Sequence, residues 1–132
     1  MRARVIIYNP DLTAILLIHR QKKQRNYWVV PGGGAKRSET PRETAIREIN
    51  EELQIELTPA QLRQLFVIDD EYFFLTDYRQ KAVPDISGEE KERSTSTNVY
   101  RPAWVTLSEL LKINLMPPAL SNKILAVIKY RL

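Results

Sequence analysis

The chain has 132 residues and a formal charge of +4. This length suits one domain with one core, and 43% hydrophobic with 27% charged residues is ordinary for a globular protein. Cysteine is absent, which excludes disulfides, thiolate metal sites and cysteine nucleophiles and favours a cytoplasmic location. No apolar run is long enough to cross a bilayer, and the run near the N-terminus is too short for a signal peptide.

The first third of the chain is rich in β-forming residues. Residues 4–8 (RVIIY) and 14–20 (AILLIHR) flank the turn-forming segment NPDLT and predict a hairpin. Residues 27–30 (YWVV) predict another short strand, which ends at a proline followed by three glycines.

A helix with a marked start follows these glycines. Thr40 can cap it, Pro41 suits the first helical position, and Glu43 completes a capping box. We predict that this helix runs to about Leu53.

The remaining chain predicts further strands and a final helix. A short helical turn at 59–65 leads into β structure at 65–69 and 71–78, and the weakly apolar residues 79–97 predict a long loop that could serve as a lid or binding segment. A late strand (98–105), a short helix (107–112) and an amphipathic helix beginning at the prolines 117 and 118 complete the chain. This order indicates a mixed α/β domain, of the α+β type, with helices packed on a curved sheet.

Three glutamates, Glu48, Glu51 and Glu52, lie within five residues of the predicted helix. At 100° per residue their side chains fall between about 240° and 340°, apart from an apolar face between about 0° and 100°. Carboxylates grouped in this way are compatible with a site for a hard cation such as Mg²⁺ or Mn²⁺. The same run is also common on exposed helices that bind nothing, so the helix by itself leaves both interpretations open.

Positive charge is concentrated between residues 19 and 38, where six cations occur without any acid. Such a patch favours anionic partners, such as nucleotides or phosphates, although two solvated loops would have the same composition. Within it we select Arg20, Lys36 and Arg37 as candidate substrate-binding residues.

Residues 33–55 resemble the Nudix box, whose pattern is G-x5-E-x7-R-E-U-x-E-E-x-G-U, with U an aliphatic residue. Every defining position matches except the last glycine, where this chain has Gln54. The matching residues are Gly33, Glu39, Arg47, Glu48, Ile49, Glu51, Glu52 and Ile55. The resemblance implies a Nudix-like α/β/α sandwich with a mixed curved sheet and a loop-helix-loop catalytic segment, forming a single domain over residues 1–132. Gln54 departs from the glycine expected as a left-handed C-terminal cap, which implies an altered helix exit or about 1 kcal/mol of local strain.

The resemblance also implies an activity, the hydrolysis of a nucleoside diphosphate linked to another moiety, with Mg²⁺ or Mn²⁺ as cofactor. By the matched positions, Glu48, Glu51 and Glu52 are metal ligands, and the Gly32 carbonyl is a candidate fourth ligand. Arg47 and Glu39 are expected to orient the box through a mutual ion pair.

The general base is left open. Some family members use the glutamate that matches Glu48, which is our first choice, and others use an acid on a later loop, for which Glu89, Glu90 and Glu92 are candidates. Substrate identity is open as well. The small, single-domain build is similar to the MutT-like branch that cleaves nucleoside triphosphates, while dinucleoside polyphosphates, nucleotide sugars and ADP-ribose remain alternatives.

Other functions are less compatible with the sequence than hydrolysis. A P-loop is rejected because Ala35 separates Gly34 from Lys36 in "GGGAKRS", and a single histidine, His19, excludes multi-histidine zinc sites. A nucleotide-sensing Nudix module without catalysis is the serious alternative, and the intact glutamates argue against it. We expect a nucleotide-type small molecule as partner, with no stable nucleic acid complex and no membrane. Homodimers are frequent in the family, and a homodimer of this chain is therefore left open.

Overall fold

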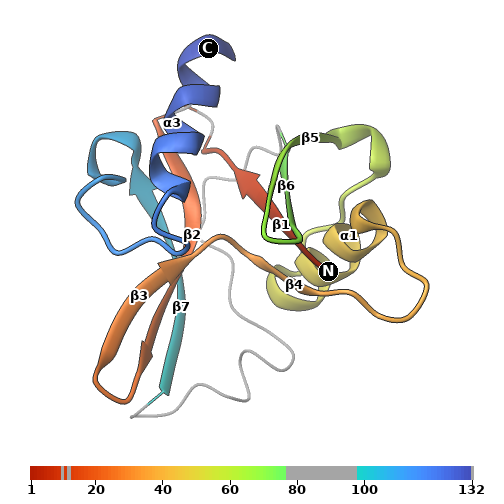
Figure 1. Cartoon of the computed structure of the whole chain (residues 1–132), viewed down its shortest axis with the longest axis horizontal. Helices are drawn as coiled ribbons and strands as arrows, with labels where there is room; N and C mark the ends of the chain where they lie inside the picture. Colours follow the sequence, from red (N-terminus) through yellow and green to blue (C-terminus); the bar gives the residue numbers. More distant parts are fainter. Residues whose placement is uncertain (10, 12, 77–97, 132) are drawn as a thin grey trace.

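The computed structural model describes residues 1–9, 11, 13–76 and 98–131, and its elements follow one another as strands, helix, strands and helix (Figure 1). The strands are β1 (Arg2–Ile7), β2 (Ala14–Lys22), β3 (Arg25–Val29), β4 (Gly32–Gly34), β5 (Leu62–Ile68), β6 (Glu71–Thr76) and β7 (Asn98–Thr106). The helices are α1 (Pro41–Leu53) and α3 (Leu120–Arg131), and two 3₁₀ turns are η1 (Pro59–Gln61) and η2 (Leu107–Glu109). The predicted α+β class is confirmed.

The strands form two sheets. One is mixed, in the order β4-β1-β6-β5, with β1 parallel to β6 and antiparallel to β4, and the other is antiparallel, in the order β3-β2-β7. The predicted hairpin between β1 and β2 is therefore wrong for most of its length. In the described residues their β pairing is limited to the bridge between Tyr8 and Ile15, and the two strands belong to different sheets. The hairpin that does form joins β2 to β3.

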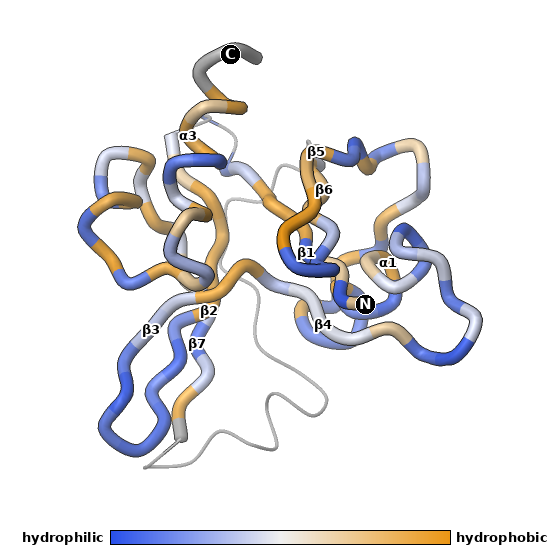
Figure 2. Tube along the Cα trace, viewed as in Figure 1, coloured by the Kyte–Doolittle hydropathy of each residue, from blue (hydrophilic) through white to orange (hydrophobic). Residues whose placement is uncertain are grey.

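The two helices cover opposite faces of the strands. Alternate residues of β1 point to opposite sides, so Val5 and Ile7 enter a cluster with Ile49 of α1, whereas Ile6 enters a second cluster with Ile124 of α3. Figure 2 shows hydrophobic residues along β1 and the adjoining part of β6, and hydrophilic residues toward the tip of the β2–β3 hairpin. This arrangement confirms the expected α/β/α layers.

Several boundaries differ from the sequence prediction. The predicted helix at 107–112 is only the turn η2, and α3 begins at Leu120 rather than at the prolines before it. The predicted loop at 79–97, with its candidate acids Glu89, Glu90 and Glu92, lies outside the described residues. None of the helices in the described part of the chain has the length and apolar character needed to span a membrane.

Candidate active site

The start of α1 is defined by its cap. Thr40 has an extended backbone, its hydroxyl accepts a hydrogen bond from the Glu43 amide (3.1 Å), and the Glu43 carboxylate accepts one from the Thr40 amide (2.9 Å). The predicted capping box is thus present in full, with Pro41 at the first helical position. It sets where the first turn begins and hence which side chains of α1 face β4.

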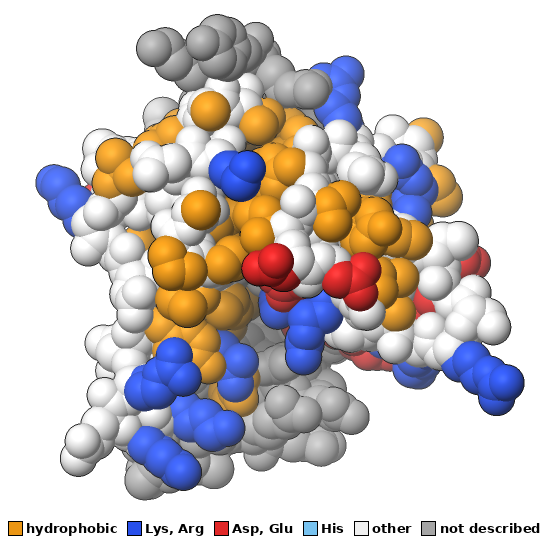
Figure 3. Space-filling model, in the orientation of Figure 1, with side chains coloured by type: hydrophobic (Ala, Val, Ile, Leu, Met, Phe, Trp, Pro, Cys, Tyr) orange, Lys and Arg blue, Asp and Glu red, His pale blue; other side chains and the backbone are white. Residues whose placement is uncertain are grey.

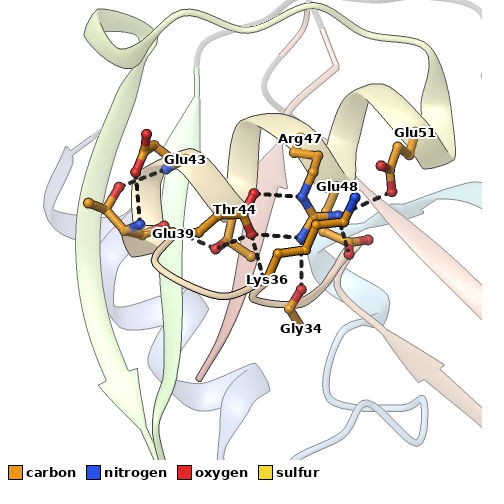
Figure 4. A network of polar contacts seen from close by, with 9 residues as sticks. Gly34, Lys36, Glu39, Glu43, Thr44, Arg47, Glu48 and Glu51 are labelled. Atoms are coloured by element: carbon orange, nitrogen blue, oxygen red, sulfur yellow. Dashed lines mark hydrogen bonds and ion pairs between the residues drawn. The ribbon is translucent and has the colours of Figure 1, made fainter.

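Arg47 ties the loop before α1 to the middle of the helix (Figure 4). Its Nε and Nη2 donate to the two oxygens of Glu39 at 2.7 and 2.8 Å, and Nη2 also donates to the Gly34 carbonyl at 2.9 Å. Glu39 in turn accepts from the Lys36 amide at 2.7 Å and from the Thr44 hydroxyl at 3.1 Å. The predicted ion pair between Arg47 and Glu39 is present, in the bidentate geometry that favours such pairs.

This pairing changes the acid–base properties of both groups. The hydrogen bonds from Arg47, followed by that from the Lys36 amide, lower the pKa of Glu39 from 4.5 to about 2. The hydrogen bond to Glu39 raises the pKa of Arg47 above its ordinary value. Both groups are therefore charged at neutral pH.

Glu48 and Glu51 also face Arg47. The Nη1 atom of Arg47 lies 3.0 Å from Glu48 Oε1 and 3.2 Å from Glu51 Oε2. The Glu48 side chain is 16% exposed and that of Glu51 is 50% exposed. One guanidinium thus lies between two carboxylates that would otherwise repel each other.

Glu48 also lies directly against β4. A Cβ atom added to Gly33 would lie 2.5 Å from the Glu48 carboxyl carbon, whereas one added to Gly34 would meet no described atom within 4 Å. Gly32 has φ +149°, and a Cβ there would lie 2.1 Å from the Ala3 carbonyl oxygen. Two of the three consecutive glycines are therefore required, one by the carboxylate and one by the neighbouring strand.

Glu52 occupies a different environment from the other two glutamates. Glu52 is only 6% exposed, and its Oε2 lies 3.4 Å from the Gly32 amide nitrogen. The Gly32 N–H is therefore directed to Glu52. The proposed role of the Gly32 carbonyl as a metal ligand stays a prediction.

The three glutamates supply oxygen ligands of the kind that Mg²⁺ and Mn²⁺ prefer. As the side chains lie, however, no three acidic or histidine side chains in residues 1–9, 11, 13–76 and 98–131 are close enough together to hold a metal ion. Glu48 and Glu51 turn to Arg47, and Glu52 turns to Gly32. The donor chemistry fits a hard cation, while the positions of the side chains reflect their protein partners.

The predicted patch of positive charge is divided between two places. Arg20 lies on β2 in the three-stranded sheet, whereas Lys36 and Arg37 lie in the exposed loop between β4 and α1. Figure 3 shows Lys and Arg side chains gathered at the tip of the β2–β3 hairpin. Sequence adjacency suggested one patch, but the chain leaves the hairpin before it reaches Lys36.

Two neighbours of Arg20 were not predicted from the sequence. Tyr27 and Tyr100 lie directly opposite it on β3 and β7. A two-residue turn at Lys23 and Gln24 would have placed Tyr27 across from Arg20, so the hairpin register held the signal for the first tyrosine. The pairing with Tyr100 is between distant parts of the sequence and left no such signal.

The C-terminal end of α1 resolves the question raised by Gln54. This residue adopts the left-handed conformation (φ 57°, ψ 34°), and its amide donates to the Asn50 carbonyl at 2.9 Å. The helix therefore ends in the left-handed geometry expected of a glycine cap. A residue with a side chain, such as Gln54, adopts this conformation at a cost in backbone free energy.

Comparison with known proteins agrees with this fold. Over 85 residues the chain is 31% identical to dihydroneopterin triphosphate diphosphatase of Haemophilus influenzae, an alignment that covers 63% of this chain. The matched segment amounts to 52% of that relative, so the chain spans about half the length of the curated protein it matches.

Solved structures with the same architecture cover nearly the whole chain. A MutT structure from work on Aliivibrio salmonicida and Vibrio cholerae is 22% identical with a TM-score of 0.67, covering 98% of this chain and 96% of that one. An Ap4A hydrolase from C. elegans is 19% identical with a TM-score of 0.67, covering 98% and 97%. The NUDIX domain family matches residues 1–125, and this protein belongs to that family.

Proposed function

We propose that this protein is a metal-dependent pyrophosphohydrolase, which cleaves the phosphoanhydride bond of a nucleoside diphosphate linked to another moiety. Nucleoside triphosphates, cleaved in a MutT-like manner, are the first substrates to test. The observation that carries the proposal is the carboxylate set of α1, in which Glu48 and Glu51 gather around Arg47 and Glu52 is buried beside Gly32. Support also comes from the family and from the diphosphatase of H. influenzae.

In this proposal Glu48, Glu51 and Glu52 hold Mg²⁺ or Mn²⁺, with the Gly32 carbonyl as a further ligand. A bound divalent cation would neutralise phosphate oxygens and lower the pKa of a water molecule. The Arg47 guanidinium keeps its two bonds to Glu39 and its bond to Gly34, which fix the loop, while Glu48 and Glu51 turn away from Nη1.

The remaining roles belong to groups that act on water and phosphate. Glu48, which lies against Gly33 and is mostly shielded from solvent, accepts the proton of the water that attacks phosphorus. The anhydride P–O bond then breaks, and the leaving oxygen departs on its phosphate. Arg20, Lys36 and Arg37 are the proposed contacts for phosphate charge.

The test is a substrate panel. Nucleoside triphosphates, including 8-oxo-dGTP, together with nucleotide sugars, ADP-ribose and dinucleoside polyphosphates are incubated with Mg²⁺ or Mn²⁺, and phosphate-containing products are separated by chromatography. Glu52→Gln should lower kcat by at least about 100-fold, because it removes a proposed ligand of the divalent cation that would neutralise the phosphate oxygens. Glu56→Gln is the matched control, since Glu56 is exposed just beyond α1, and it should cleave like the wild type.

Two results would contradict the proposal. One is tight nucleotide binding without cleavage of any compound, which would identify a nucleotide-sensing module. The other is cleavage that Glu52→Gln leaves unchanged. A single domain over residues 1–132, a homodimer and a cytoplasmic location stay predictions, which size-exclusion chromatography and cell fractionation would test.

A further inference from the structure

Arg20 lies between two tyrosine rings. Its guanidinium carbon is 4.4 Å from the centroid of the Tyr100 ring and 5.4 Å from that of Tyr27, and its Nη2 donates to the Tyr100 hydroxyl. Such cation–π contacts hold a guanidinium without neutralising its charge. The side chain is thereby fixed in orientation by residues from both neighbouring strands.

Among the residues that the structure describes, the charge and one donor of Arg20 have no counterpart. In the described part of the chain Arg20 forms no ion pair with a carboxylate, and its buried Nε–H has no hydrogen-bond partner. A second cation, Arg25, lies 5.0 Å from the Tyr27 ring. A buried donor without an acceptor costs roughly 1–3 kcal/mol, so the site is suited to receive an anion.

Arg20 faces the same side of the sheet as the catalytic helix. Arg20, Tyr27 and Tyr100 are aligned across the three strands and therefore project from one face. Ile18, two residues earlier on β2, shares this face and belongs to the core cluster that contains Ile49 of α1. By contrast His19 projects to the opposite face, where its ring stacks on Trp28 at 4.4 Å. The unbalanced guanidinium is thus on the face that is turned toward α1.

We propose that Tyr100 and Tyr27 build an oxyanion subsite around Arg20, in which the fixed guanidinium binds a phosphate group of the substrate. This inference rests on the proposed function for the identity of the substrate. Tyr100 is the main positioning residue, because it supplies both a ring and a hydroxyl, whereas Tyr27 supplies only its ring in the described structure. Arginine pre-oriented in this way loses little side-chain freedom when an oxyanion binds.

The test measures binding without catalysis. Inorganic pyrophosphate, the group shared by the candidate substrates, is titrated into the protein by calorimetry in buffer with EDTA and low salt. Arg20→Gln should raise the Kd by about 10-fold or more, and Tyr100→Phe by about 3- to 10-fold, as expected for losing a charged hydrogen bond or its support. Tyr72→Phe, at a tyrosine of β6 in the other sheet, is the matched control and should keep a Kd within about twofold of the wild type.

A second measurement separates positioning from general stability. In the metal-loaded enzyme, Tyr100→Phe should raise KM and leave kcat unchanged, because the contact is made equally in the ground and transition states. Tyr27→Leu serves as a further variant, which removes one ring and should raise the Kd for pyrophosphate.

The subsite is overturned if the wild type does not bind pyrophosphate, or if Arg20→Gln or Tyr100→Phe binds it as the wild type does. Binding is measured without metal and without turnover, so failure of the subsite and absence of hydrolysis are distinguished. A protein that binds pyrophosphate through Arg20 but cleaves nothing would retain the subsite and refute the hydrolase.

Discussion

At the scale of single residues, the contact between Gly33 and Glu48 limits what the site can accommodate. The Glu48 carboxylate occupies the space where any other residue at position 33 would place its Cβ atom, with all three carboxyl atoms within 2.7 Å of that point. Real Cβ atoms are not found so close to other heavy atoms, so a side chain at 33 must displace either the glutamate or the strand. The proposed catalytic carboxylate and the backbone of β4 are therefore coupled sterically.

We expect Gly33→Ala to lower kcat by at least about 10-fold, because moving a reacting group by about 1 Å has large effects on rate. Gly34→Ala is the matched control, since a Cβ there meets nothing within 4 Å, and it should retain wild-type activity. Steady-state kinetics would measure both variants, and circular dichroism would verify that they fold. Equal activity of the two variants would show that the position of Glu48 does not limit catalysis.

At the scale of elements, α1 is held by contacts at its start, middle and end. The capping box sets the first turn, Arg47 reaches back to Glu39 and Gly34, and Gln54 closes the helix in a left-handed conformation. The ion pair spans eight residues of sequence, so it fastens the preceding loop to the helix rather than one turn to the next. Its loss should affect the geometry of the loop more than the helix itself.

The ion pair predicts a pH dependence of stability. Because the folded-state pKa of Glu39 is lowered from 4.5 to about 2, its contribution is fully present above pH 4.5 and is lost as the pH falls toward 2. Glu39→Gln lacks this contribution, so the difference in free energy of unfolding between wild type and variant should be constant above about pH 5 and shrink below pH 4.5. Urea unfolding between pH 7 and pH 3 measures this difference. A difference that stays constant throughout that range would contradict the assignment.

At the scale of the whole molecule, the strands divide the apolar residues between two clusters. Leu16 of β2 joins the cluster of α1, and Leu17 joins the cluster of α3. The same strands supply side chains to both clusters. Loss of packing in one cluster therefore disturbs strands that the other cluster also requires. The two sheets and two helices should therefore unfold together.

We expect Ile49→Ala and Ile124→Ala each to lower the free energy of unfolding by about 2–5 kcal/mol, as is usual for buried side chains reduced to alanine. Both residues are almost fully buried, at 0% and 1% exposed, and they belong to different clusters. Leu111→Ala, at a 62% exposed position, should change stability by no more than about 0.5 kcal/mol. Urea unfolding followed by tryptophan fluorescence and by circular dichroism should give one shared transition for each protein. Separate transitions would show that the clusters are independent.

Local chemistry made much of α1 predictable. Thr40, Pro41 and Glu43 specify a helix start through contacts within four residues, and the apolar and acidic faces follow from helical geometry. The pairing partners of the strands were harder to predict. β1 and β2 are apolar on both faces because both are buried, and such runs match many partners equally well. The short connection favoured a hairpin, but β1 pairs with β6 and β2 with β7 instead.

Residue types and short spacings are enough to predict a capped helix that carries Glu48, Glu51 and Glu52 after three glycines, with Arg47 within reach of Glu39. Those features depend on residue types and on short spacings, both of which can be read directly from the amino-acid sequence. The three-dimensional fold was needed to place Glu48 against Gly33 and Glu52 beside Gly32. It was also needed to place Arg20 between the rings of Tyr27 and Tyr100. Such contacts join strands far apart in the sequence, and they depend on the pairing and packing of the entire core.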